Sequence, residues 1–222
     1  MIDNSKDPGE KTAKILLDIE AVSWSLQTPY ILTSGNASPV YVDCRKLISF
    51  VKERKEIIHM LAEKTKSDIG MENIEVIAGG ETAGIPLAAW LAESLNLPMV
   101  YVRKKSKGFG KDKIIEGVME KGKKVLLVED LATTAKSKLS FCESLRNAGA
   151  EVNDTLVIFE YGCYPDTYKE LKAANLKLHS LTTWEILLKT AEKIGLLKKE
   201  ESKIIKDFLK DPISWSREYK GI

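Results

Sequence analysis

The sequence predicts an α/β protein: an open, doubly wound and mostly parallel sheet flanked by helices, with an N-terminal hood of hairpin and helix. Short apolar segments, nearly free of polar side chains, alternate with helical patterns over residues 75–181. Strands of this kind are typical of a parallel sheet buried on both faces. Right-handed crossovers cover both faces with helices, so ligands are expected at the carboxyl ends of the strands.

The predicted elements follow in order along the chain. Asp7-Pro8 is typical of a helix N-terminus, and apolar residues at helical spacing continue as far as Val22. Strands are expected at residues 30–33, 40–43, 75–78, 99–103, 123–128, 155–159 and 176–181. Helices are expected at residues 52–66, 83–95, 136–147 and 166–174, with two more over residues 183–208. The first two strands flank a turn at residues 34–39.

Composition excludes several classes of protein. The 222 residues include 34 basic and 32 acidic side chains, too even a balance for a general nucleic-acid binder. The longest uncharged apolar run, Gly84 to Ala92, is far below the roughly twenty residues of a membrane span. Three scattered cysteines and two histidines argue against a disulfide framework or a zinc cluster. The N-terminus has no apolar signal core, so a cytoplasmic protein is expected, without nucleic-acid or membrane partners.

Two adjacent carboxylates, Glu129 and Asp130, follow the apolar strand at residues 125–128. Small and hydroxylic residues then lead into a helix: Leu131, Ala132, Thr133, Thr134, Ala135, Lys136 and Ser137. Backbone N–H groups at a helix N-terminus bind phosphate, and threonine hydroxyls add donors. Carboxylates beside a phosphate site indicate sugar hydroxyls, bound directly or through Mg²⁺ and its waters. An acidic strand end before a capped helix would explain Glu129 and Asp130 alone, but it explains the whole string poorly.

This string resembles the phosphoribosyl-pyrophosphate motif of the type I phosphoribosyltransferases. The resemblance implies that Glu129 and Asp130 hold the ribose hydroxyls and that Thr133 to Ser137 hold the 5′-phosphate. It implies Mg²⁺ as the cofactor, bound through the substrate, with Asp130 as its candidate protein contact. A second segment, Ala78 to Ala88, looks like the family's pyrophosphate loop, with Gly84 and Pro86 starting the next helix.

A basic segment follows the strand at residues 99–103. From Arg103 to Lys113 it holds five lysines, one arginine and two glycines. Such dense positive charge suits a polyanion, and glycines allow closure over a ligand, although a solvated basic loop is a common alternative. The segment resembles the mobile catalytic loop of orotate phosphoribosyltransferases, which reaches the neighbouring site of a homodimer. By that resemblance Arg103, Lys104 and Lys107 contact phosphate, and Lys104, Lys107 and Asp130 are the candidate catalytic residues.

The turn at residues 34–39 resembles the substrate hairpin of the orotate enzymes, in which backbone amides and an aromatic residue contact a flat base. Ser34, Gly35 and Tyr41 would take that role here. With these motifs the resemblance covers residues 17–184, most of the chain. It implies that the reaction converts orotate and 5-phosphoribosyl 1-pyrophosphate to orotidine 5′-monophosphate and pyrophosphate. We expect one domain over residues 1–222, with a hood and hairpin (1–70), a core sheet (71–182) and C-terminal helices (183–222).

The chain also departs from the pattern. Many members have histidine where Phe109 stands, lysine in place of Thr33, and arginine where this chain has Glu160-Tyr161. Many have glycine at the place of Ala135; if that place requires positive φ, alanine costs about 1 kcal/mol there. Two other functions remain open: transfer to another base, which the Ser34-Gly35 hairpin disfavours, and a non-catalytic phosphoribosyl-pyrophosphate sensor, which would not need the lysine loop.

Overall fold

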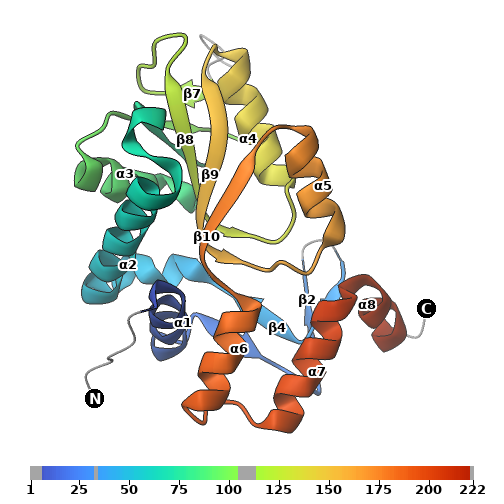
Figure 1. The fold of residues 1–222 in the computed structure, drawn as a ribbon. Coiled ribbons are helices and arrows are strands. Elements are labelled where there is room, and N and C mark those ends of the chain that lie inside the picture. Colours follow the sequence, from blue (N-terminus) through green and yellow to red (C-terminus); the bar gives the residue numbers. More distant parts are fainter. Residues whose placement is uncertain (1–6, 33–34, 105–113, 221–222) are drawn as a thin grey trace.

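The computed structural model describes residues 7–32, 35–104 and 114–220. Its centre is a six-stranded sheet in the order β10-β9-β8-β5-β6-β7 (Figure 1). Every neighbouring pair is parallel except β6 and β7, so the predicted mostly parallel sheet is confirmed. The strands of this sheet are β5 (Val76–Gly80), β6 (Met99–Val102), β7 (Ile115–Glu116), β8 (Lys124–Ala132), β9 (Glu151–Glu160) and β10 (Lys177–Thr183).

Helices cover both faces of the sheet, as the apolar strands require. On one face, Ile77, Leu126 and Ile158 pack in a cluster with α1 (Pro8–Asp18), α2 (Val51–Lys64) and α3 (Gly84–Leu95). On the other face, Ala78 and Leu127 pack against α4 (Lys136–Asn147) and α5 (Pro165–Ala173). Successive strand residues therefore alternate between two buried layers, which explains why the strands contain so few polar residues.

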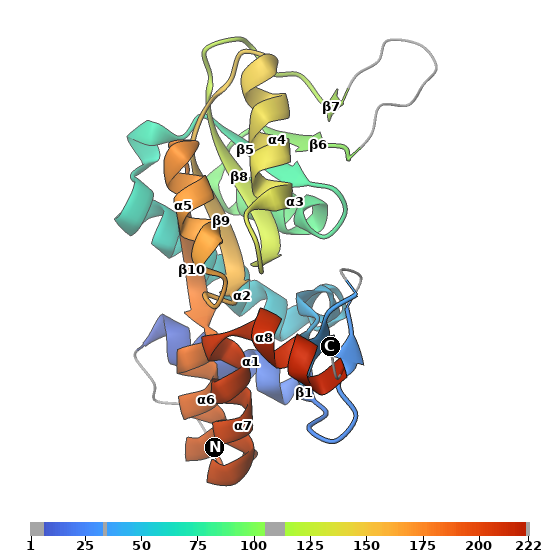
Figure 2. The same cartoon turned by 90° about the vertical axis from the view of Figure 1, so that its right-hand side faces the viewer.

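The N-terminal strands form a hood at the carboxyl edge of the sheet, next to the C-terminal helices (Figure 2). β1 (Val22–Trp24) pairs with β4 (Val40–Val42), and β2 (Tyr30–Ile31) pairs with β3 (Ala37–Ser38). The sequence pattern predicts strands at residues 30–33 and 40–43 on either side of one turn. This prediction is wrong in its pairing, because β2 and β4 pair with different strands. Pro39 has no N–H for a ladder, and at this residue the chain passes from one strand pair to the other.

Two further differences from the sequence-based expectations concern element ends. The first helix ends at Asp18, and Val22 lies in β1. β8 continues to Ala132, so Glu129 and Asp130 lie within the strand, because its ladder with β9 extends to Ala132 and Glu160. The two helices expected over residues 183–208 are confirmed as α6 (Trp184–Lys193) and α7 (Lys199–Lys210), and a further helix, α8 (Pro212–Lys220), follows them.

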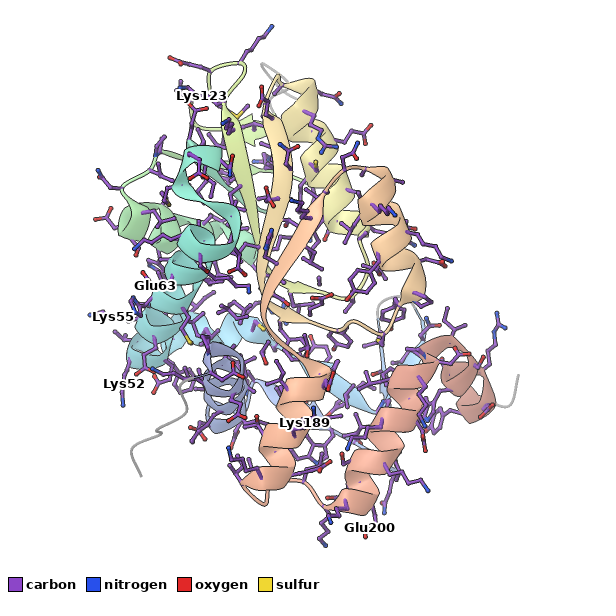
Figure 3. The ribbon with its side chains drawn as sticks, viewed as in Figure 1. Lys52, Lys55, Glu63, Lys123, Lys189 and Glu200 are labelled. Carbon is purple, nitrogen blue, oxygen red and sulfur yellow. The ribbon has the colours of Figure 1, made fainter. Side chains whose placement is uncertain are left out.

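Charged side chains project outward from the helical layers. Lys52, Lys55 and Glu63 point away from α2, and Lys189 and Glu200 do the same from α6 and α7 (Figure 3). The opposite side of α2 is buried and apolar, which is the amphipathic pattern predicted for it. No helix within the described ranges is long and apolar enough to cross a membrane.

Candidate active site

A cavity of about 1140 Å³ lies where the carboxyl ends of the strands meet the hood and α8. Segments that follow or end β5, β6, β8 and β9 border it, as expected for ligand binding in an open α/β sheet. The structure brings eight predicted site residues to its wall: Tyr41, Lys104, Glu129, Asp130, Leu131, Thr133, Thr134 and Lys136. Arg103, Ala132, Ala135, Ser137 and Gly35 are described but do not line it, while Lys107 and Ser34 lie outside the described residues.

Asp130 and Glu129 occupy successive positions of β8 and have different surroundings. Burial raises the pKa of the Asp130 carboxyl above its usual value, and the neighbouring charge of Glu129 adds to this effect. Lys138 acts in the opposite direction on the Asp130 pKa. A carboxylate held in this way has incomplete hydration and is a strong acceptor for ligand hydroxyls.

Glu129 is held by the start of α4. Its Oε2 atom accepts a hydrogen bond from Ser137 Oγ at 2.8 Å and lies 2.7 Å from Lys138 Nζ. Lys138 is itself buried, and it also donates to the carbonyl of Leu131. Sequence analysis did not identify Lys138, because a lysine one turn into a helix usually lies on a solvated face. Ser137 and Lys138 thus join the end of β8 to the first turn of α4.

The segment between β8 and α4 borders the cavity with Thr133, Thr134 and Lys136. Within the described chain, no side chain caps the N-terminus of α4, so its first N–H groups are available to an anion. Ala135 has φ −73° and ψ −15° and is buried. The condition of positive φ is therefore not met at this residue: the backbone there is right-handed helical, which alanine adopts without strain.

The hood contributes an aromatic wall and a cation. The rings of Tyr30 and Tyr41 lie with their centroids 5.8 Å apart. Arg45 donates to Tyr41 OH at 3.2 Å and to both carboxylate oxygens of Asp43, at 2.6 and 2.9 Å. That guanidinium lowers the pKa of the Asp43 carboxyl. Gly35 lies on the exposed turn with φ +81°, a conformation that favours glycine.

The stems of the basic segment lie at the β6–β7 edge of the sheet (Figure 2). Arg103 N–H donates to the Ile114 carbonyl at 2.8 Å, and its guanidinium lies 3.8 Å from Glu116. Lys104 lines the cavity, and its backbone N–H donates to Glu81 Oε2 at 2.7 Å. Glu81 therefore connects the loop after β5 to the start of the basic segment.

Gly84 allows close approach of α3 to β8. A Cβ atom at this residue would lie 2.4 Å from the Val128 carbonyl oxygen. The first turn of α3 consequently sits directly against the backbone that precedes Glu129, and the segment from Glu81 to Ala83 borders the cavity. The helix begins at Gly84, as predicted for the second segment.

Glu160 and Tyr161 stand where many members of the family that the sequence resembles have an arginine. Tyr161 and Tyr164 line the cavity, and burial raises both pKa values, that of Tyr164 to about 12. Glu160 instead accepts hydrogen bonds from Tyr168 and, at 2.9 Å, from Ser180 Oγ. The cations on the described wall of the cavity are Arg45, Lys104 and Lys136, against the carboxylates of Glu81, Glu129 and Asp130.

The carboxylate oxygens of the site suit a metal ion that takes few of its ligands from the protein. Within residues 7–32, 35–104 and 114–220, no group of three His, Cys, Asp or Glu side chains could hold a metal ion by itself. Mg²⁺ commonly binds one or two carboxylates and completes its shell with water and substrate phosphate oxygens. Asp130, facing a polar cavity, fits that mode of binding.

A second cavity, of about 830 Å³, lies near the amino ends of β8, β9 and β10. There His179 Nε2 lies 2.8 Å from Asp154 Oδ1, and charges of both signs line the walls. None of the predicted site residues that the structure describes borders this cavity, so the chemistry is assigned to the larger one.

Comparison with known proteins agrees with the motifs. The family model described as phosphoribosyl transferase domain matches residues 51–173. An orotate phosphoribosyltransferase of Dinoroseobacter shibae is 49% identical over 209 residues, which span 94% of this chain and 92% of that relative. The matched residues 51–173 contain the carboxylates and the phosphate segment, but neither the hood hairpin nor the helices after α5.

Solved structures extend the likeness to the fold. The orotate phosphoribosyltransferase of Aeropyrum pernix has a TM-score of 0.70 and 32% identity, and covers 84% of this chain and 99% of its own. UMP synthase of Leishmania donovani has a TM-score of 0.76 and 25% identity over 90% of this chain and 42% of its own. The likeness therefore reaches well beyond the residues of the family model.

Proposed function

The chain belongs to the orotate phosphoribosyltransferase family, and we propose that it transfers the phosphoribosyl group of 5-phosphoribosyl 1-pyrophosphate to orotate. The products are orotidine 5′-monophosphate and pyrophosphate, a step of de novo pyrimidine synthesis. The observation that carries the proposal is the convergence, around one cavity, of the carboxylates of β8, the uncapped start of α4 and the aromatic hood.

Each region of the cavity suits one part of the substrates. The N–H groups of the first turn of α4, with the hydroxyls of Thr133 and Thr134, are placed to bind the 5′-phosphate. Asp130 and Glu129 accept hydrogen bonds from the ribose hydroxyls. Tyr41 borders the end of the cavity that we assign to the flat base. Ser34 and Gly35 remain predicted contacts of the same base by the resemblance of the hairpin. Arg45 is the described cation at this end, and we assign it to the negative charge of orotate.

The reaction breaks the bond between ribose C1 and pyrophosphate and forms a bond from C1 to a ring nitrogen of orotate, whose N–H bond breaks and releases a proton. Positive charge builds on the ribose ring as pyrophosphate leaves. Ionised Asp130 and Glu129 stabilise that charge, and Lys104 and Lys107 stabilise the charge on the leaving group. When bound, Mg²⁺ supplies charge neutralisation at the pyrophosphate, with Asp130 as the candidate contact on the protein. No protein nucleophile is required.

We further infer a homodimer in which residues 103–113 of one chain serve the site of the other, with no nucleic-acid or membrane partner. The position of both stems at an edge of the sheet supports this arrangement. We also infer that residues 1–222 act as one domain with the three parts described above. A cytoplasmic location is supported by three buried, free cysteines, since disulfides are rare in reducing compartments.

The decisive test is the loss of orotate absorbance in the purified protein. We expect turnover that requires both 5-phosphoribosyl 1-pyrophosphate and Mg²⁺ and that stops when a chelator is added. Uracil, which lacks only the carboxylate of orotate, tests the choice of base in the same assay. Turnover of uracil at the rate of orotate, or no orotate turnover at all, would contradict the proposal.

A further inference from the structure

The last helix, α8, lies against the hood although more than 170 residues separate them in the chain. Figures 1 and 2 both show α8 beside the N-terminal strands, at the carboxyl edge of the sheet. It also lies outside the matched family model, which ends at residue 173. α8 thus stands at the edge of the candidate active site, outside the segment that the family model describes.

Ser216 of α8 completes the hydrogen bonding of the hairpin. Its Oγ atom accepts the backbone N–H of Ala37 at 2.8 Å, and both residues are almost fully buried. Ala37 pairs with Ile31 in the two-residue ladder of β2 and β3, which has no further strand on the Ala37 side in the described sheet. Without Ser216 the Ala37 N–H would be buried and unsatisfied, which destabilises the hairpin conformation.

The position of α8 is fixed by its own sequence. Asp211 Oδ1 accepts the Ser214 N–H at 3.0 Å, and Pro212 begins the helix, so the chain turns sharply after α7. Trp215 then packs edge-on against Phe208 of α7, with ring centroids 5.4 Å apart, and stacks on Tyr219 at 5.7 Å. These contacts hold Ser216 beside β3, within hydrogen-bonding distance of the Ala37 N–H.

One residue of α8 reaches the cavity itself. Ile213 borders it together with Tyr30 and Leu32 of the hairpin and Tyr164 beyond β9. Its side chain is about half exposed, at 48%, although it is a large apolar group. An apolar residue at this place suits the face of a flat ring better than it suits open water.

We propose that α8 is a positioning element for the nucleobase: Ser216 sets the hairpin that contacts the base, and Ile213 forms part of the apolar wall beside it. The inference rests on the proposed function, because it names the end of the cavity that receives orotate. It assigns no role to α8 at the phosphate end, which is built from β8 and α4. Changes in α8 should consequently affect orotate and spare 5-phosphoribosyl 1-pyrophosphate.

The test compares Ser216→Ala and Ile213→Ser with Glu218→Ala, a control at an exposed residue of the same helix. We expect Ser216→Ala to raise the KM for orotate about five- to tenfold, and Ile213→Ser to raise it about threefold. The KM for 5-phosphoribosyl 1-pyrophosphate should stay within twofold, and Glu218→Ala should leave both constants unchanged. Titration calorimetry of orotate binding should show the same order of affinities.

Two outcomes would overturn the inference. An unchanged KM for orotate in both variants would mean that α8 does not shape the base site. An equal rise of both Michaelis constants in Ser216→Ala would mean that the serine serves only general stability. Absence of orotate turnover in the unmodified protein would instead contradict the proposed function, so the wild-type assay separates the two failures.

Discussion

Lys138 Nζ and Glu129 Oε2 lie 2.7 Å apart, with side-chain exposures of only 5% and 9%. The pair joins the strand that carries the carboxylates to the helix that begins the phosphate site. A buried pair of this kind contributes little net stability, but removing one partner leaves an uncompensated charge. Lys138 thus places a positive charge directly beside the Glu129 carboxylate in a largely buried site.

Replacing Lys138 by the uncharged Met should lower the free energy of unfolding by about 3 kcal/mol, since breaking a buried ion pair typically costs 3–5 kcal/mol. The double variant Lys138→Met/Glu129→Gln should recover most of this loss, because no charge is then left unpaired. Urea denaturation of the two single variants and the double variant measures the coupling. Strictly additive losses would show that the two side chains act independently.

Much of the fold could be predicted because local signals agree with the packing. Asp7-Pro8 marks the start of α1, and Asp7 Oδ1 accepts the Gly9 N–H at 2.8 Å. α4 spans Lys136–Asn147, the predicted range, since small residues precede an amphipathic pattern there. By contrast, Asp211-Pro212 carries the same signal as Asp7-Pro8, yet α8 was not predicted, because the short segment after it lacks a clear apolar stripe.

The errors at the site have a common physical cause. The polar residues Glu129 and Asp130 suggested that β8 ended at Val128, whereas backbone pairing with β9 continues past them. Lys138 was overlooked because its burial depends on a carboxylate nine positions earlier, a relation that periodicity does not encode. Ile213 lines the cavity only because the chain folds α8 back onto the hood. Functional sites often depart in this way from local sequence rules.

Asp130→Asn should reduce turnover at least about a hundredfold, since a charged hydrogen bond lost in the transition state costs about 3 kcal/mol. The same change should stabilise the free protein at neutral pH. The pKa of Asp130 is raised in the folded state, so ionisation above that pKa disfavours the fold, and this penalty disappears as the pH falls below the unfolded value. Each kcal/mol gained in the free energy of unfolding raises Tm by about 2–4 °C.

Activity assays and thermal melts at pH 7 and pH 4 check both parts of this prediction. The rise of Tm in Asp130→Asn relative to the unmodified protein should be larger at pH 7 than at pH 4. Near-normal activity of Asp130→Asn would show that Asp130 takes no part in the reaction. A lower Tm of the variant at pH 7 would show that the charge of Asp130 is well compensated in the folded protein.

Ala135→Gly should leave the KM for 5-phosphoribosyl 1-pyrophosphate within twofold of its original value. The right-handed backbone of Ala135 provides no strain for glycine to relieve, and its methyl group is buried in the core beside α4. We expect a loss of stability of up to about 1 kcal/mol. Steady-state kinetics and urea denaturation provide the two measurements; a severalfold lower KM would indicate a left-handed backbone in the bound state.

Lys136→Ala should weaken binding of 5-phosphoribosyl 1-pyrophosphate about fivefold at low salt, from the loss of ~1 kcal/mol. Lys136 is exposed and lines the cavity at the first residue of α4, where a phosphate would lie. The salt dependence of the KM should become shallower, because the variant lacks the ionic contact between Lys136 and phosphate, which salt screens. Lys55→Ala, at an exposed lysine of α2, is the matched control. Equal behaviour of the two variants at every salt concentration would place Lys136 outside the phosphate site.

The inter-subunit role of the basic segment can be tested by mixing two defective chains, Lys107→Ala and Asp130→Asn. Each pure dimer should be nearly inactive. If residues 103–113 cross the interface, one site of the mixed dimer receives Lys107 from the Asp130→Asn chain and Asp130 from the other. The second site then carries both defects. Re-equilibrated mixtures should therefore regain a substantial share of activity. Each mixed dimer should have about half the activity of the unmodified dimer, because one of its two sites is complete.

A loop that served its own chain would give the opposite result, because every site would keep one defect at any mixing ratio. Native mass spectrometry confirms that mixed dimers have formed, which keeps a negative result meaningful. Of the described stem residues, Arg103 is hydrogen-bonded to Ile114 at the outer edge of the sheet and does not line the cavity of its own chain, whereas Lys104 does line it. The mixing experiment with Lys107 therefore decides between the two arrangements. Activity that stays flat across all ratios, with mixed dimers present, would rule out the shared site.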